Sequence, residues 1–445
     1  MSQNQQFLLD RAAMLVDKAL KAGADAADAV VARSQSTSVS VRLGKVEGTD
    51  ASESDDFSLR VFVGKRVASV SANAAGDPAQ LAERAVGMAR VAPEDPYAGL
   101  ADEARLATQF PDLDLADTAA PDSARLTSDA LAMEEAALAV PGVANSVGAG
   151  ASSGSGGMVL VTSHGFAGAY NATRYSRSVS VLAGEGTKME RDYDFSSRLF
   201  FDELEKPQTI GKSAGERAVR RLNPRKMSTQ TVACVFDPRA SRGLVGHLAG
   251  AINGASVARK TSFLRDFLGK PVMAPGIRVT DNPLIRRGPS SRPFDGEGVS
   301  GEALTLVEDG VLQTWLLSTS AAKQLGMTTN GRGVRSGAQV SPASTNLELA
   351  PGDATPQEMI RSIWTGFYVT EVFGQGVNMV TGEYSRGASG FWIENGEIAF
   401  PVSEVTIASN LKDMFLRMVG ANDIDRNFGI AAPTILIEGM TLAGA

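Results

Sequence analysis

The chain has 445 residues, with 43 Lys and Arg against 50 Asp and Glu, so its formal net charge is −7. This length predicts two or three domains, and the acidic balance disfavours proteins that bind nucleic acid through a broad positive surface. The single cysteine, Cys234, excludes an intrachain disulfide and fits a reducing compartment. With only two histidines, His164 and His247, an ordinary zinc site of His and Cys ligands is also disfavoured.

No targeting or membrane segment is indicated. Residues 1–10 contain no basic residue ahead of an apolar run, which is unlike a secretory signal peptide. No stretch of about 18 apolar residues occurs, because Gly, Ser or a charge interrupts each run. A cytoplasmic location without membrane contact is therefore expected.

The first elements follow from periodicity. Apolar residues recur at helical spacing near the N-terminus, and they then alternate with polar residues as in half-buried strands. Asp77 and Pro78 supply an N-cap and a proline at the first helical position. The predicted elements are a helix over 7–20, two antiparallel hairpins over 39–70 with turns at 44–45 and 64–65, and a helix over 78–90.

A second segment repeats this order. Residues 93–121 lack a sustained period and predict a solvated connection, after which a helix over 124–138 is expected. Strands are predicted around 158–162, 166–171, 175–182 and 189–200, and the Gly- and Ser-rich residues 150–154 suggest a flexible or edge strand. The closing helices both contain the letters ERAV, at 83–86 and 216–219. Residues 5–90 and 124–222 are therefore interpreted as an internal duplication.

The remaining chain favours antiparallel strands. Asp309-Gly310 and Asn395-Gly396 are two-residue hairpin signals, and a strand is expected over 231–236. The predicted fold class is α+β, with an N-terminal α+β domain over 1–222 and a β-rich antiparallel domain over 228–445. Short helices are expected over 319–325, 356–365 and 411–419.

Two local patterns have open interpretations. A basic cluster around the linker at 223–228 is interpreted as a solvated helix face or a partner of the helix dipole; it comprises Arg217, Arg220, Arg221, Arg225 and Lys226. Residues 384–392 mix Gly and Ser with aromatic residues. They form either a core strand relieved by glycine or a strand that another backbone can approach for strand addition.

Several sequence blocks in the C-terminal half resemble the TldD/PmbA family, and specifically its PmbA (TldE) branch. The blocks are RGLVGHLAGAI (242–252), SVARKTSFL (256–264), RPFDGEG (292–298), LQTWLL (312–317), VTE (369–371), GQGV (374–377), TGEYSRGASGFW (381–392), ENGE (394–397), PVSE (401–404) and NLKDM (410–414). The N-terminal half agrees in layout more than in letters.

The resemblance implies a cytoplasmic metallopeptidase built from two related subunits, in which a TldD-type subunit holds zinc or a similar metal. That subunit carries an H-E-x-x-x-H motif, which aligns here with Arg242, Gly243 and His247, so only the last ligand remains. A hydrolytic zinc needs about three protein ligands and a general base. No metal and no catalytic residue is therefore expected in this chain, whose expected partner is a TldD-type subunit.

The resemblance also suggests a site. Arg242, His247, Tyr384 and Arg386 are expected near a relic cavity that holds a peptide or faces the active site of the partner. The alternative is that His247 only packs within a helix.

Two functions from different classes stay open. The first is a TldE-like subunit that aids binding and proteolysis of unfolded peptides. The second is a homodimeric binding or regulatory protein without proteolysis, in line with the family's description as a modulator of DNA gyrase. A third function, an autonomous metallopeptidase that uses carboxylate ligands, ranks last because no acidic pair shows ligand spacing.

Overall fold

The computed structural model of the chain describes residues 3–73, 76–337 and 339–444. Residues 1–2, 74–75, 338 and 445, which fall inside the expected domain ranges, lie outside the described residues. Helices are mixed with mostly antiparallel sheets, which confirms the α+β fold class. We call residues 3–222 the N-terminal region and residues 229–444 the C-terminal region, and the domain boundaries themselves stay a prediction.

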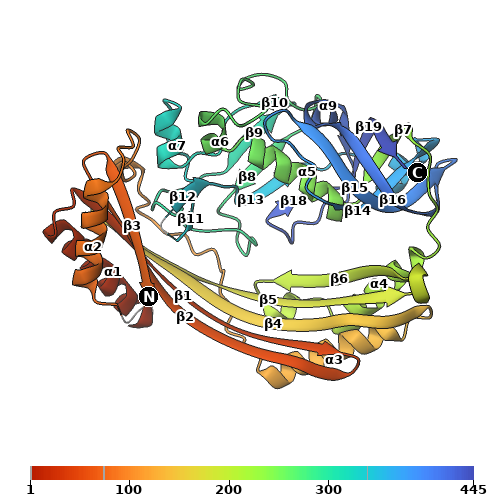
Figure 1. Cartoon of the computed structure of the whole chain (residues 1–445), viewed down its shortest axis with the longest axis horizontal. Helices are drawn as coiled ribbons and strands as arrows, with labels where there is room; N and C mark the ends of the chain where they lie inside the picture. The colour runs from red at the N-terminus through yellow and green to blue at the C-terminus, as the bar shows by residue number, and fades with distance from the viewer. Residues whose placement is uncertain (1–2, 74–75, 338, 445) are drawn as a thin grey trace.

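One antiparallel sheet forms the frame of the N-terminal region, with the strand order β3-β2-β1-β4-β5-β6. Its strands are β1 (Ala26–Arg42), β2 (Lys45–Val63), β3 (Arg66–Asn73), β4 (Val143–Thr162), β5 (Ala167–Ala183) and β6 (Glu190–Arg198). The central pair, β1 and β4, joins the two halves of the region. Figure 1 shows these long strands curving beneath the C-terminal region.

Both halves of this region have the same order of elements, a helix, three strands and a helix, while the internal duplication itself stays a prediction. The helices are α1 (Gln3–Lys21), α2 (Pro78–Val91), α3 (Ser123–Leu138) and α4 (Pro207–Arg220). As predicted, Asp77 caps α2 by accepting a hydrogen bond from the backbone N–H of Ala79 at 2.9 Å.

The four helices cover the two ends of one sheet face, as Figure 1 shows. Side chains alternate between faces along a strand, so the odd-numbered residues of β1 share the helical face. Ala29 and Val31 pack in the core with α1 and α2, whereas Val39 and Val41 pack with α3 and α4. Gln35, between these apolar stretches, is exposed, so the middle of the sheet has no helical cover.

The expectation of a flexible or edge strand at 150–154 is wrong. These residues lie in the middle of β4, which pairs with β1 on one side and β5 on the other. Strands at 158–162 and 175–182 were predicted from their apolar residues, but β4 and β5 extend far beyond those stretches. Backbone pairing on both edges outweighs the low strand propensity of Gly and Ser.

The connection over 93–121 is not a solvated linker throughout. Its Leu113 and Leu115 are buried against Leu199 and Phe200, and the Leu115 carbonyl accepts a hydrogen bond from the backbone N–H of Thr173 at 3.0 Å. The segment therefore packs against the sheet as an irregular strap. The short 3-10 helices of the N-terminal region are η1 (Glu103–Arg105), η2 (Gly186–Lys188) and η3 (Phe201–Glu203).

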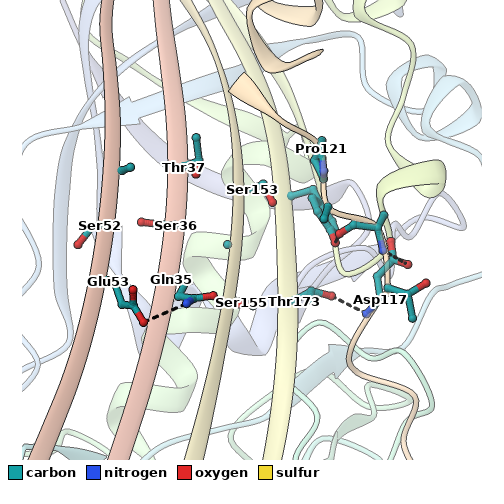
Figure 2. Close-up of a pocket in the computed structure, with 16 residues that line it drawn as sticks. Gln35, Ser36, Thr37, Ser52, Glu53, Asp117, Pro121, Ser153, Ser155 and Thr173 are labelled. Atoms are coloured by element: carbon teal, nitrogen blue, oxygen red, sulfur yellow. Dashed lines mark hydrogen bonds between the residues drawn. The ribbon is translucent and has the colours of Figure 1, made fainter. Parts of the chain in front are cut away.

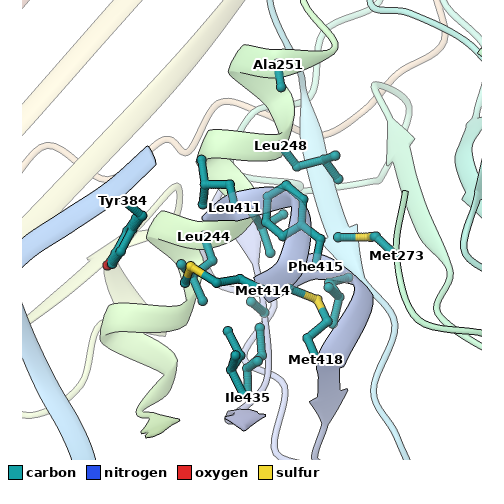
Figure 3. Close-up of a cluster of buried hydrophobic side chains, with 14 of the residues drawn as sticks. Leu244, Leu248, Ala251, Met273, Tyr384, Leu411, Met414, Phe415, Met418 and Ile435 are labelled. Atoms are coloured by element: carbon teal, nitrogen blue, oxygen red, sulfur yellow. The ribbon is translucent and has the colours of Figure 1, made fainter. Parts of the chain in front are cut away.

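A second six-stranded sheet organises the C-terminal region in the order β16-β15-β14-β7-β19-β17, and β16 also pairs with β19, so five of its strands form a closed ring. The strands are β7 (Gln230–Phe236), β14 (Thr365–Phe373), β15 (Glu383–Glu394), β16 (Glu397–Asn410), β17 (Met418–Gly420) and β19 (Ile435–Ala443). Two helices, α5 (Pro238–Ala251) and α9 (Leu411–Arg417), contribute Leu244, Leu248, Met414 and Phe415 to its core (Figure 3).

The other elements of the C-terminal region form a smaller sheet, a hairpin and short helices. The smaller sheet is β10 (Val311–Leu312), β9 (Leu304–Glu308), β8 (Val279–Asn282), β13 (Asn346–Leu349) and β18 (Ile430–Ala431); the hairpin is β11 (Gly333–Ser336) and β12 (Gln339–Pro342); the helices are α6 (Gly254–Ala258), α7 (Thr319–Gln324) and α8 (Pro356–Arg361).

Both predicted hairpin turns are confirmed, with positive φ at Asp309 and Asn395 and at the glycine after each. Two predicted helices are shorter than expected. The helix predicted over 356–365 ends at Arg361 because Thr365 already pairs in β14, and the helix predicted over 411–419 ends before Met418 enters β17. Strand pairing outweighs local helical periodicity at both ends.

The two regions meet at a buried ion-pair cluster that we call the closed junction, made of Asp28, Arg60 and Arg335 with the adjoining loop 292–298. The Asp28 carboxylate lies 2.5 Å from Arg60 of β2 and 2.6 Å from Arg335 of β11. Burial by itself raises the pKa of Asp28, but the two guanidinium groups outweigh it and hold the pKa below its ordinary value.

The loop 292–298, one of the blocks that carried the family resemblance, fills the closed junction. Phe294 packs edge-on against Phe166 and Tyr170 of the N-terminal region, with ring centroids 4.9 and 5.3 Å apart. Asp295 accepts hydrogen bonds from the backbone N–H groups of Val299 at 2.9 Å and Gly333 at 2.8 Å. This block therefore holds the two regions together.

Candidate functional site

The helix α5 carries two of the four predicted site residues. It begins at Asp237, which accepts a hydrogen bond from the Arg239 N–H at 2.9 Å, and Pro238 occupies its first position. Leu244 and Leu248 bury one face of α5 in the core of the C-terminal region. Its opposite face turns Arg239 and Arg242 toward the N-terminal region.

A network of charges fixes α5 relative to β6 and the end of α4. Arg221 lies 3.3 Å from Asp192 and 2.9 Å from Glu371, and its guanidinium also donates to the Ser389 hydroxyl at 2.7 Å. Arg239 lies 3.1 Å from the other oxygen of Asp192. The sequence interpretation of the basic cluster as a solvated face is therefore wrong for Arg221, which joins the two regions.

A cavity of about 540 Å³ opens between α5, β6 and α4, and we call it the α5 pocket. Its wall includes Phe195 of β6, Arg217 of α4, Tyr368 of β14 and the loop residues Asp425 and Phe428. The wall mixes aromatic rings with charges of both signs, which is a composition suited to binding a polar ligand.

Arg242 lies in the wall of the α5 pocket with its guanidinium over the Phe428 ring, 3.5 Å from the centroid. Its Nε donates to the Pro238 carbonyl at 3.1 Å. Burial lowers the pKa of Arg242, and the nearby Asp425 carboxylate offsets this only in part, although a guanidinium stays charged near neutral pH.

His247 of α5 lies beside Tyr384 and Arg386 of β15, away from the wall of the α5 pocket. The rings of His247 and Tyr384 meet edge-on at 6.0 Å, and Tyr384 is buried. Burial, and then the charge of Arg386, lower the pKa of His247, so its ring is neutral at pH 7. Burial raises the pKa of the Tyr384 hydroxyl, and Arg386 donates from Nε to the Phe373 carbonyl at 3.1 Å.

The structure thus groups three of the four predicted residues and separates the fourth. Arg242 and His247 are five positions apart, which places them about 140° apart around a helix. None of His247, Tyr384 and Arg386 lines the α5 pocket. The predicted relic cavity shared by all four stays a prediction, while Arg242 has a cavity of its own.

The strand that contains Tyr384 is not available for strand addition. Both edges of β15 are paired, one with β14 and the other with β16. Both glycines have close neighbours: a Cβ added at Gly390 would lie 1.9 Å from the Tyr368 carbonyl oxygen, and one added at Gly387 would lie 2.2 Å from the Phe373 ring. Residues 384–392 therefore form a core strand relieved by glycine, the other of the two interpretations.

The α5 residues that align with the metal-binding motif do not fit a hydrolytic metal. Arg242 is cationic and Gly243 offers no side chain, so neither can supply a ligand or a base. Cys234 is fully buried in β7, where desolvation raises the pKa of its thiol to about 12. Across residues 3–73, 76–337 and 339–444, no three His, Cys, Asp or Glu side chains gather as a metal site would need.

A second cavity, of about 570 Å³, lies over the uncovered middle of the N-terminal sheet (Figure 2). Gln35 donates to Glu53 at 3.1 Å across its floor, and the Asp117 backbone N–H donates to the Thr173 hydroxyl at 2.8 Å. Because these polar groups already form hydrogen bonds with one another, this cavity is a weaker candidate for a ligand-binding site than the α5 pocket.

Sequence reasoning missed Phe428 and the loop that carries it. Phe428 approaches Arg242 from residues far along the chain, and Phe195 of β6 supports it edge-on at a centroid distance of 5.7 Å. No local pattern marks this stacking, because the three residues come from three separate elements.

Among the described helices, none is long and apolar enough to cross a membrane.

Comparison with known proteins covers nearly the whole chain. Models of the PmbA/TldA metallopeptidase family match in three parts: domain 1 over residues 27–89, the central domain over 116–222 and the C-terminal domain over 229–444. The chain belongs to the PmbA/TldD family. The Metalloprotease PmbA homolog of Haemophilus influenzae is 38% identical over 99% of this chain and 97% of its own length, which supports the PmbA (TldE) branch.

Solved structures of other proteins share the fold. A protein from Bacteroides thetaiotaomicron, described as a candidate modulator of DNA gyrase, aligns over all of both chains with a TM-score of 0.91 and 28% identity. TldE from Thermococcus kodakarensis aligns over 97% of this chain and 99% of its own with a TM-score of 0.83 and 20% identity, which shows the fold alone.

Proposed function

We propose that this chain is the TldE-type subunit of a cytoplasmic TldD/TldE metallopeptidase. In this proposal a TldD-type partner holds the catalytic metal, and the present chain helps to bind unfolded peptides. Curated relatives named Metalloprotease PmbA, others named Metalloprotease TldD homolog, and a TldE structure support such an assembly.

The observation that carries the proposal is the chemistry of α5. Arg242 and Gly243 occupy the positions of the first ligand and the general base, and neither can bind a metal or accept a proton from water. The remaining His247 lies beside Arg386 and packs against Tyr384 instead. In this proposal the chain keeps the family fold, and the changed motif leaves the activation of water to the TldD-type partner.

The α5 pocket supports a role in peptide binding. It lies between the two regions, and its wall offers aromatic rings and charges to a ligand. A cavity of this size accommodates a few amino-acid residues but not a folded protein. An unfolded segment therefore suits it better than a globular substrate does.

The experiment that tests this proposal is peptide hydrolysis by the purified chain, by a TldD-type subunit and by their mixture. We expect cleavage of an unstructured peptide only when the TldD-type subunit is present, with a higher rate in the mixture. Equal rates with and without the present chain would refute its role as a working subunit.

A second candidate function is a homodimeric regulatory protein without proteolysis. It is favoured by the structural likeness to the protein described as a candidate modulator of DNA gyrase. Light scattering separates the two functions. A chain that stays a homodimer in the presence of a TldD-type subunit supports regulation, whereas exchange into a heterodimer supports the peptidase assembly.

A further inference from the structure

The arginines of the α5 pocket are not equally paired. Arg198, Arg217 and Arg239 each form an ion pair with a carboxylate, with N–O distances of 3.7, 3.8 and 3.1 Å. Arg242 forms no ion pair with any residue in the described part of the chain. One guanidinium in this pocket is therefore not engaged in an ion pair with a described residue, although the Asp425 carboxylate lies nearby.

Five carboxylates also line the pocket, and each already has a partner: Asp194, Glu205, Asp237, Asp423 and Asp425. Asp194 and Glu205 pair with two of the pocket arginines. Asp237, Asp423 and Asp425 accept hydrogen bonds from backbone N–H groups at 2.8 to 2.9 Å. These carboxylates are held by local structure, and none of them forms a hydrogen bond or ion pair with Arg242, although the charge of Asp425 acts on it.

The geometry of Arg242 prepares it for a ligand. Its guanidinium carbon lies 3.5 Å from the centre of the Phe428 ring, and Phe195 of the N-terminal region packs edge-on against that ring. Among the described residues its only hydrogen bond runs from Nε to the Pro238 carbonyl. The two Nη groups make no hydrogen bond to any described residue, so they can donate side by side to a ligand. A planar fork of N–H donors matches a carboxylate in two parallel hydrogen bonds.

We propose that the α5 pocket binds a carboxylate group through the free Nη edge of Arg242. The five acidic side chains of the wall disfavour a doubly charged phosphate more than a singly charged carboxylate. The proposed function supplies the source, and the inference rests on it for that point alone: an unfolded peptide presents either its C-terminal carboxylate or an acidic side chain.

The reactivity of Arg242 tests the site directly. We expect phenylglyoxal, which modifies unpaired arginines, to label Arg242 in the full chain, while Arg239 on the same helix, held by Asp192, is protected and serves as the internal control. Labelled positions are identified by mass spectrometry of peptides. Protection of Arg242 without any ligand would overturn the proposal.

Four probes distinguish the ligand class. They are acetyl-Ala-Ala with a free C-terminal carboxylate, acetyl-Glu-Ala-amide, acetyl-Ala-Ala-amide and inorganic phosphate. We expect slower labelling of Arg242 with the first or the second probe, and whichever protects better identifies the source. Equal labelling with all four, or protection by phosphate alone, would overturn the proposal.

A variant connects the site to peptide binding by the assembled subunits. Arg242→Ala is expected to weaken binding of a fluorescent unfolded peptide about 10- to 100-fold, the effect of losing charge-assisted hydrogen bonds, when the probe carries the recognised carboxylate. Binding of the amide-capped peptide is expected to stay unchanged. Arg265→Ala, which removes the same charge from an exposed side chain outside the pocket, is the matched control.

The carboxylate site and the proposed function can be refuted separately. If peptides bind, but Arg242→Ala changes the affinity neither for the peptide with the carboxylate nor for the amide-capped peptide, the carboxylate site is wrong and the proposed function stands. If carboxylates protect Arg242 but no peptide is bound or cleaved by the mixed subunits, the proposed function is wrong and the site stands.

Discussion

The N-terminal sheet meets the C-terminal region at two places that use arginine and carboxylate in opposite ways. At the closed junction, Asp28 lies between two guanidinium groups and is fully buried, and Phe294 and Phe166 fill the space beside it. At the α5 pocket a cavity of about 540 Å³ remains, and Arg242 lies in its wall without an ion pair to any described residue.

This difference indicates that the closed junction attaches the two regions to each other, whereas the α5 pocket can bind a ligand. A buried charge must keep its partners, because an unpaired charge in a dry interior costs several kcal/mol. A half-exposed guanidinium keeps part of its hydration and can stay unpaired at little cost, so it remains free for a ligand. The closed junction therefore holds the two regions in place, and the α5 pocket makes use of that placement.

Removing a partner at the closed junction is expected to have the largest effect. Arg335→Ala leaves Asp28 buried with only Arg60, which is expected to lower the free energy of unfolding by about 3–5 kcal/mol. The midpoint of urea unfolding measures the loss. The control Arg426→Ala removes an exposed pair with Glu348 and should cost less than about 1 kcal/mol. Similar losses for both variants would contradict the closed junction.

A smaller effect is expected at Arg221, which lies near the α5 pocket. Its side chain is 12% exposed and binds Asp192 and Glu371, so Arg221→Ala is expected to cost about 1.5–3 kcal/mol. The variant should also speed proteolysis within the linker at 223–228, which gel electrophoresis follows. The control Arg217→Ala, with one long ion pair on a more exposed side chain, should leave the proteolysis rate unchanged.

At Arg242 the effect on stability should be smaller still. Arg242→Ala is expected to change the free energy of unfolding by less than about 1 kcal/mol, because it removes one hydrogen bond to a helix carbonyl and a stacking contact. The same urea titration applies. A loss as large as that of Arg335→Ala would mean that Arg242 holds the structure together and is not kept free for a ligand.

The smallest effect concerns pH and His247. Its pKa in the folded chain lies below the ordinary value of about 6.5, so the unfolded chain binds the proton more readily as the pH falls below that value. Stability should decrease on the acid side, and His247→Phe should remove that part of the slope. Thermal midpoints between pH 5 and 7 measure it, and an unchanged slope would contradict a partly buried, neutral ring.

Local chemistry made parts of the fold predictable. Asp77-Pro78 and Asn395-Gly396 each act on their own backbone, as a helix start and a turn with positive φ, and both were predicted correctly. The stretch at 150–154 was not, because its strand is held by partners from β1 and β5 that no local pattern contains. Likewise, Leu113 and Leu115 are buried by residues about 85 positions away.

The candidate site also has parts that the sequence predicts and parts that it does not. The sequence placed Arg242 and His247 on one segment with an altered metal motif, and the structure puts both on α5. That the two point to different surroundings follows from helix geometry and could have been anticipated. Phe428 could not, because the approach of its loop to α5 depends on the fold of the whole C-terminal region.

The central claim is that this chain contributes binding while its partner contributes the metal. The most direct measurement is plasma mass spectrometry of metals in the chain purified alone and in the assembly with a TldD-type subunit, with peptide hydrolysis assayed on the same samples. The account predicts metal and cleavage only in samples that contain the TldD-type subunit. Stoichiometric metal together with cleavage in the chain alone would contradict it.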